Sequence, residues 1–217
     1  MKYLKMLGLA ALAVASMAFI GVGSASATEL CSTTTNPCTS PYGVGTVIAG
    51  SSTNATLTSS LGNVVCSGSS MEGKTTSQGS SKTNVEGTIE KVSFSGCTLT
   101  TPFGGGIHNC SVTPINTPWK AVVATEITGV VNDNGLMTVS SDGNGEPGAK
   151  VDCGASVLRC QFTASSIVLN VNGGTSPTVV AKEEPLNRAV YEGGLCPSTS
   201  TWDANYSITK PTPLYVI

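Results

Sequence analysis

Short segments in which apolar and polar residues alternate recur along most of this chain, and their two-residue period is the strongest constraint on its fold. Alternate residues of a strand face the same side, so these segments predict half-buried β-strands. Gly, Asn, Asp and Ser clusters separate them, and Asn-Gly and Asp-Gly favour tight hairpin turns. The predicted strands are residues 44–48, 55–58, 63–66, 87–94, 119–125, 137–139, 166–171, 178–180 and 206–209.

No segment after residue 27 has the spacing of a helix of useful length. The fold prediction is therefore all-β: an antiparallel β-sandwich of about 10–13 strands. We expect residues 28–217 to form one domain and residues 211–217 to form a final edge strand.

The N-terminus has the features of a secretory signal. Lys2 and Lys5 precede an apolar run over residues 6–22, and Ala25-Ser26-Ala27 follows. This order predicts a signal peptide over residues 1–27, cleaved after Ala27. The alternative is a membrane anchor, but about 17 apolar residues are few for a span, so no transmembrane anchor is expected after cleavage. The alanine-rich signal is typical of a bacterium, and we expect a secreted or envelope-associated protein.

All eight cysteines follow the predicted signal. An even number of cysteines in an exported chain predicts a disulfide framework. Two pairs are seven residues apart around a turn, one pair brackets the loop 101–106, and the last pair follows by elimination. The predicted pairs are Cys31–Cys38, Cys153–Cys160, Cys97–Cys110 and Cys66–Cys196. A zinc site is the alternative, but the chain has no Cys-x-x-Cys and a single histidine.

Charged residues are sparse. The 217 residues include 11 Lys and Arg and 13 Asp and Glu, or 11 % charged, against about 25 % in typical soluble proteins. Without residues 1–27 there are 9 basic groups (11 minus 2) and 13 acidic groups, a net charge of −4. The basic residues are scattered singly, so we expect no nucleic-acid partner, which needs a basic patch.

Residues suited to catalysis are few. A serine or cysteine hydrolase needs a base, usually His, and the only histidine, His108, is expected in a loop beside Cys110. A glycosidase needs two carboxylates, but Glu183-Glu184 has the character of a solvated loop. Asp142, Asn144 and Glu146 alternate as in a calcium loop, and a β-turn uses the same residues. We predict no catalytic residue, no metal and no cofactor.

The sequence also suggests an internal duplication. Asn63 and Asn144 are 81 residues apart, and Trp119 and Trp202 are 83 residues apart. Each Trp comes after a cysteine and a short segment, which is rich in Pro before Trp119 and rich in Ser and Thr before Trp202. A duplicated half would place each Trp at the start of an equivalent strand, where a large ring closes one end of the core.

The cysteine motifs carry a resemblance. Glu29-Leu30-Cys31, Asn36-Pro37-Cys38, Gly62-Asn63-Val64-Val65-Cys66, Phe94-Ser95-Gly96-Cys97 and Gly193-Gly194-Leu195-Cys196-Pro197-Ser198 resemble a group of exported, uncharacterised Cys-rich proteins of actinobacteria. The resemblance covers nearly all of residues 28–217 and implies no activity. Phe94-Ser95-Gly96-Cys97 with Pro118-Trp119 is remotely similar to alkane-oxidation activator and biofilm-matrix proteins, which implies a role in a matrix or at a surface.

These observations predict an exported, non-enzymatic structural or surface/matrix protein of the bacterial envelope. Its partners are unknown; cell-surface or matrix polymers are the partners that such a role implies. The alternative is an extracellular binding module for a small apolar ligand or a glycan. Trp119, Trp202 and Tyr206 are the candidates for stacking on that ligand, although a place in the core is the competing interpretation of each.

Overall fold

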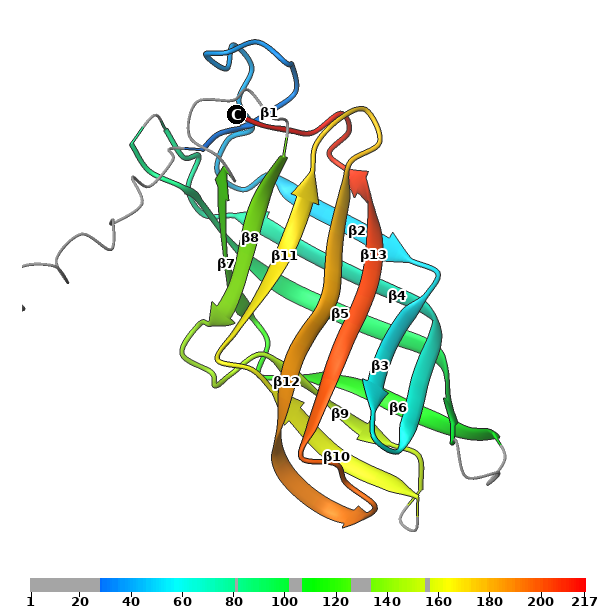
Figure 1. Cartoon of the computed structure of the whole chain (residues 1–217). Helices are drawn as coiled ribbons and strands as arrows, with labels where there is room; N and C mark the ends of the chain where they lie inside the picture. The colour runs from blue at the N-terminus through cyan, green and yellow to red at the C-terminus, as the bar shows by residue number, and fades with distance from the viewer. Residues whose placement is uncertain (1–27, 81, 102–106, 126–133, 155–156) are drawn as a thin grey trace, which may run out of the picture.

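The computed structural model describes residues 28–80, 82–101, 107–125, 134–154 and 157–217, so the predicted signal lies outside the described residues. The described chain is β throughout (Figure 1). Its strands are β1 (Leu30–Cys31), β2 (Val47–Ser52), β3 (Ala55–Ser59), β4 (Gly62–Thr75), β5 (Val85–Thr100), β6 (Ile107–Ile115), β7 (Trp119–Thr125), β8 (Asn134–Ser141), β9 (Gly148–Asp152), β10 (Leu158–Thr163), β11 (Ser166–Asn172), β12 (Thr178–Gly194), β13 (Thr199–Lys210) and β14 (Tyr215–Val216).

The two-residue period of the sequence becomes an alternation of burial. In β11 the buried side chains are Ile167, Leu169 and Val171, and the residues between them are exposed. One face of each such strand therefore packs into the core while the other faces water. The all-β antiparallel fold predicted from this period is confirmed.

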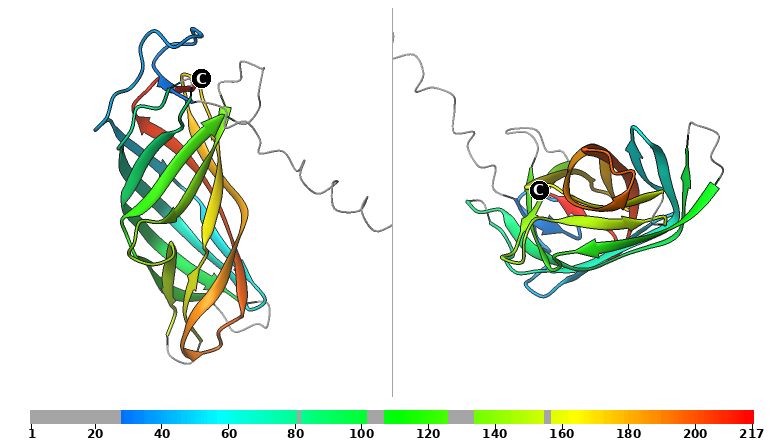
Figure 2. Two further views of the ribbon diagram at one scale, coloured as in Figure 1. Left: turned by 90° about the vertical axis from the view of Figure 1, so that its left-hand side faces the viewer. Right: turned by 90° about the horizontal axis from the view of Figure 1, so that it is seen from below.

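Twelve strands form one sheet that closes on itself, so the two layers of the sandwich are joined by hydrogen bonds. Every strand pair in this sheet is antiparallel. Figure 2 shows an elongated body whose strands run obliquely along it and surround a common interior. The buried apolar side chains of all these layers form one core cluster.

The sheet closes as two consecutive rings that share the long strands β4, β5, β12 and β13. The upper ring in Figure 1 adds β7, β8, β11 and β2. The lower ring adds β6, β9, β10 and β3. The change from one ring to the other occurs where β2 ends and β3 begins, and it divides the interior into two levels.

The ends of the described chain pair with each other. Leu30 of β1 lies opposite Val216 of β14, and the Glu29 backbone N–H donates to the Ile217 carbonyl oxygen at 2.6 Å. The Thr28 hydroxyl accepts a hydrogen bond from the Thr125 backbone N–H at 2.7 Å. The strand expected over residues 211–217 is limited to Tyr215–Val216, which pairs with β1.

Four disulfides join the eight cysteines: Cys31–Cys38, Cys66–Cys97, Cys110–Cys153 and Cys160–Cys196. The predicted Cys31–Cys38 pair is confirmed. The other three predicted pairs, Cys97–Cys110, Cys153–Cys160 and Cys66–Cys196, are wrong.

Cys97 has a cysteine opposite it on each neighbouring strand. It lies directly across from Cys110 on β6, as the predicted pair requires, and also directly across from Cys66 on β4. It bonds Cys66, with the two Cα atoms 3.8 Å apart. Cys110 then bonds Cys153, just beyond the end of the adjacent strand β9, so the loop between Cys97 and Cys110 does not decide the pairing.

Cys153 and Cys160 belong to one hairpin but are out of register. Cys160 lies opposite Val151, and the Cys153 backbone N–H donates to the Leu158 carbonyl oxygen at 2.8 Å. The two cysteines are therefore offset by two residues along the hairpin, too far for a direct bridge. Cys160 instead bonds Cys196, which follows β12 on its other side.

The predicted duplication does not describe the strands that carry the two tryptophans. Trp119 is the first residue of β7, which pairs with β5 and β8. Trp202 is the fourth residue of β13, which pairs with β12, β2 and β3. The strands are not equivalent, so the 83-residue spacing has no counterpart in the topology.

Candidate functional site

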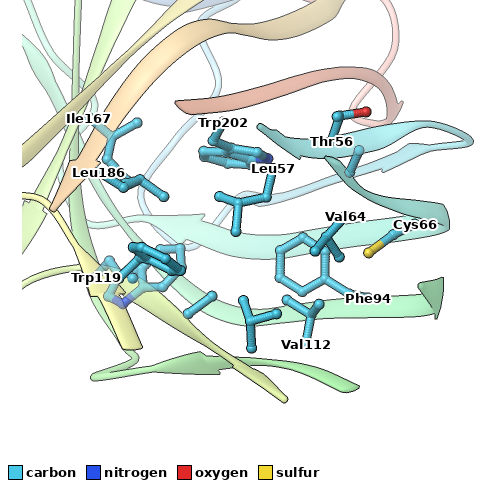
Figure 3. A pocket seen from close by; sticks show the side chains of 15 residues that line it. Thr56, Leu57, Val64, Cys66, Phe94, Val112, Trp119, Ile167, Leu186 and Trp202 are labelled. Atoms are coloured by element: carbon cyan, nitrogen blue, oxygen red, sulfur yellow. The ribbon is translucent and has the colours of Figure 1, made fainter. Parts of the chain in front are cut away.

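The lower ring encloses an apolar cavity with both tryptophans in its wall. It offers about 50 Å³ to the centres of water-sized molecules, and about 560 Å³ of space between atoms if the part open to solvent is counted. We call it the tryptophan cavity. Its lining is Ala55, Thr56, Leu57, Val64, Cys66, Phe94, Val112, Trp119, Gly148, Ala149, Val151, Phe162, Ile167, Leu186 and Trp202. Figure 3 shows Trp202 above the cavity, Trp119 at its lower left, and Phe94 and Val64 on the right.

Trp119 is fixed as a wall of this cavity. It is 5 % exposed, and its indole N–H donates to the Ile115 carbonyl oxygen at 2.9 Å. The hydrogen bond satisfies the one polar atom of the ring, as is usual for a buried tryptophan. The ring is then available only for apolar contact.

Trp202 forms the opposite wall. It is half-buried and lies across from Leu57 of β3, and its ring meets Tyr206 edge to face with 6.2 Å between centroids. Its indole nitrogen is buried and has no hydrogen-bond acceptor within the described part of the chain. An unsatisfied buried donor costs about 1–3 kcal/mol.

Tyr206 does not face the cavity as a stacking residue. It is fully buried, and its hydroxyl shares a 2.7 Å hydrogen bond with the Ser69 hydroxyl. On the inner face of β13 it lies between Trp202, which lines the tryptophan cavity, and Ile208. Burial raises the pKa of the Tyr206 phenol to about 12.

The raised pKa of Tyr206 predicts a loss of stability in base. The phenol is neutral in both folded and unfolded chains below pH 10, so its contribution is complete there. Between pH 10 and 12 the unfolded chain loses the proton first, and the free energy of unfolding falls by up to about 3 kcal/mol. Denaturant titrations at several pH values should show this fall in the wild type and a shallower fall in Tyr206→Phe. Tyr215→Phe, which changes a half-buried tyrosine of β14, is the matched control, and an equal slope in all three proteins contradicts the assignment.

The tryptophan cavity has no charged side chain in the lining formed by the described residues, and Thr56 supplies the only hydroxyl there. The ion pairs among the described residues are formed by side chains outside this lining, including Lys120–Glu86, Lys150–Glu192 and Arg159–Asp152. A neutral, apolar guest suits this cavity, because a charged or strongly polar group there lacks partners.

The residues considered for catalysis lie apart from this cavity. His108 is in β6 opposite Leu99, so the expected loop position is wrong. Glu183 and Glu184 lie at a bulge of β12 and not in a loop, and a Glu184 carboxylate oxygen accepts from the Val168 backbone N–H at 2.9 Å.

The oxygen-rich segment 142–146 and the cysteines near Glu29 hold the candidate metal ligands, and several of their groups are engaged in other contacts. The Glu146 carboxylate accepts a hydrogen bond from the Thr163 hydroxyl at 2.8 Å, and Gly143 has a φ of 90°, which a turn requires. Glu29 lies near Cys31 and Cys38, but those two sulfur atoms are bonded to each other. Thiolate ligation at that group is therefore blocked while the disulfide is intact.

Sequence reasoning named both tryptophans but not the residues around them. Leu57, Phe94, Val112 and Phe162 come from four different strands. Only the long-range register places them together, so no local pattern indicates them.

A comparison with protein-family models, curated proteins and solved structures found no match. The resemblance to exported actinobacterial proteins therefore stays a prediction. Within the described residues, no helix has the length and apolar character needed to cross a bilayer.

Proposed function

We propose that this chain is an exported, non-enzymatic binding protein that holds a small apolar molecule, or the apolar end of a larger one, in the tryptophan cavity. The observation that carries the proposal is the cavity itself, an apolar space between Trp119 and Trp202 inside a closed sheet. Largely pre-formed apolar clefts with few polar groups are the usual form of small-molecule sites.

The size of the cavity limits the guest. A cavity of about 150 Å³ accepts benzene, and the tryptophan cavity offers about 50 Å³. We therefore expect one small apolar group to enter directly. A full ring enters only when Leu57 or Trp202, both half-buried, moves outward.

A glycan fits this arrangement poorly. Sugar stacking needs exposed aromatic faces and hydrogen-bond partners for the sugar hydroxyls, yet Trp119 is 5 % exposed and Tyr206 is fully buried. The apolar branch of the predicted binding module is the one that the geometry supports.

The four disulfides support an oxidising, extracellular environment, because such bonds persist there and are rare in the cytosol. Export through residues 1–27 belongs to the proposal. A mature chain that starts at Thr28 retains all the strands that the structure describes and the four disulfides.

A structural role at the surface or in a matrix, with surface polymers as partners, is the second candidate. Several large apolar side chains remain exposed, among them Val44 at 67 %, Ile107 at 73 % and Leu195 at 61 %. Exposed apolar groups of this kind serve contacts with other macromolecules when they gather in patches. A chain that binds no apolar guest but binds a cell-surface polymer would favour this role.

Quenching of tryptophan fluorescence tests the proposal, since the chain has two Trp residues and both line the cavity. Dibromomethane, a small apolar quencher, should quench residues 28–217 along a saturating curve. Iodide, which is excluded from an apolar interior, should quench only weakly and linearly. A linear response to dibromomethane contradicts the proposed function.

A further inference from the structure

A second cavity lies in the upper ring. It offers about 60 Å³ to the centres of water-sized molecules. Both Met residues that follow position 27 line it, so we call it the methionine cavity. The apolar side chains of its wall include Met71, Met137, Ile48, Ile89, Val123 and Ile208.

The two cavities are separate. On the inner face of β13, Trp202 lines the tryptophan cavity, Ile208 lines the methionine cavity, and Tyr206 lies between them. The Tyr206 hydroxyl is hydrogen-bonded to Ser69 of β4 at 2.7 Å. This fully buried pair lies at the level where β2 gives way to β3 along β4, and no residue lines both cavities.

The walls of the cavities differ in chemistry. The tryptophan cavity has four aromatic side chains and no charged one in its described lining. The described lining of the methionine cavity has no aromatic side chain but includes Glu72, Lys74 and Glu86, each of which forms an ion pair with a side chain outside the lining. Aromatic faces suit flat groups. Methionine is unbranched and adapts its shape to a partner, so the methionine cavity suits a flexible aliphatic chain.

The backbone around the methionine cavity is irregular on one side. The β4–β5 register shifts between Glu72 and Gly73, and a Cβ at Gly73 would come within 2.1 Å of the Thr88 carbonyl oxygen. Bulges of this kind bend a strand and occur often beside binding sites. Here the bulge lies beside the methionine cavity, because Glu72 and Gly73 belong to its lining.

We propose that the methionine cavity is a second, independent binding site for a short unbranched aliphatic chain, which enters as Met71 and Met137 change conformation and enlarge the space of about 60 Å³. The partition at Tyr206 makes it independent of the tryptophan cavity. This inference goes beyond the proposed function and does not require it.

The chain carries a separate reporter for each cavity. In residues 28–217, Met71 and Met137 are the only methionines and line one cavity, while the two tryptophans line the other. With ¹³C-methyl methionine labelling, dissolved n-butane should shift both methyl resonances along a saturating curve and give cross-relaxation to them. Shifts that stay linear, with no cross-relaxation, overturn the proposal.

Matched substitutions assign the site. Ala121→Leu fills the methionine cavity and should weaken n-butane binding at least tenfold, whereas Ala149→Leu fills the tryptophan cavity and should leave it unchanged. Val123→Ile provides a second, milder filling if Ala121→Leu does not fold. Equal weakening by Ala149→Leu would place n-butane in the tryptophan cavity and overturn the proposal. Dibromomethane quenching reports the proposed function separately, so either idea can fail alone.

Discussion

Replacing Cys110 and Cys153 together with alanine should lower the free energy of unfolding by about 4 kcal/mol, because their disulfide closes a 43-residue loop and constrains the unfolded chain. The bond also links β6 to the end of β9 in the lower ring. The loss is comparable with the total stability of many domains, about 5–15 kcal/mol. Equilibrium unfolding in urea measures it.

The control is Cys31→Ala with Cys38→Ala, which opens a seven-residue loop outside the twelve-stranded sheet. This pair should cost only about 2 kcal/mol by the same argument. A disulfide map of each variant must show that the other bonds are retained. Equal losses for the two pairs, or a loss below about 1 kcal/mol for Cys110–Cys153, would contradict the role given to the longer loop.

Phe162→Ala should cost about 3–5 kcal/mol, the usual range for a fully buried phenylalanine. Phe162 is 1 % exposed and lines the tryptophan cavity from β10. The space it leaves joins an existing cavity, so the variant should accept benzene. At a benzene concentration ten times its dissociation constant, the variant should regain about 1.4 kcal/mol, measured by thermal unfolding with and without benzene.

Leu158→Ala is the matched control for this test. Leu158 is also in β10 and 1 % exposed, but it lines neither of the two cavities. Its loss should be about 2–5 kcal/mol, and because its space joins neither cavity, its recovery in benzene should be smaller than that of Phe162→Ala. Equal recovery in the two variants, or none in either, would mean that Phe162 does not border a space that accepts apolar guests.

The sequence predicts strands best where a run of Val, Ile and Leu forms one apolar face, and it misses strands such as β10 and most of β12, whose residues are more mixed. β11 and β7 bury apolar residues at alternate positions, and the segments predicted from the sequence match both strands almost to their ends. β12 extends from Thr178 to Gly194, yet only residues 178–180 were predicted, since the rest is rich in charged and small residues. Pairing on both sides holds such a segment as a strand whatever its side-chain pattern.

The disulfides show the same limit. Local turn geometry correctly gave Cys31–Cys38, which depends on seven residues of chain. The other three bonds depend on which strands are neighbours and on their register. Cys97 has Cys66 opposite it on one neighbouring strand and Cys110 opposite it on the other, so its partner depends on which of the two strands it bonds to. The same long-range register brings Trp119 and Trp202 into one cavity. The sequence therefore suggested the tryptophans as binding residues but did not show that they share a cavity.

The most direct test of the central claim compares dibromomethane quenching in two single variants. Ala149→Leu adds side-chain volume inside the tryptophan cavity. Ala121→Leu adds the same volume inside the methionine cavity and serves as the control. We predict that Ala149→Leu loses the saturating quenching, with affinity reduced at least tenfold, while Ala121→Leu retains it. Saturating quenching that survives in Ala149→Leu, or that is absent from the wild type, would contradict a guest between Trp119 and Trp202.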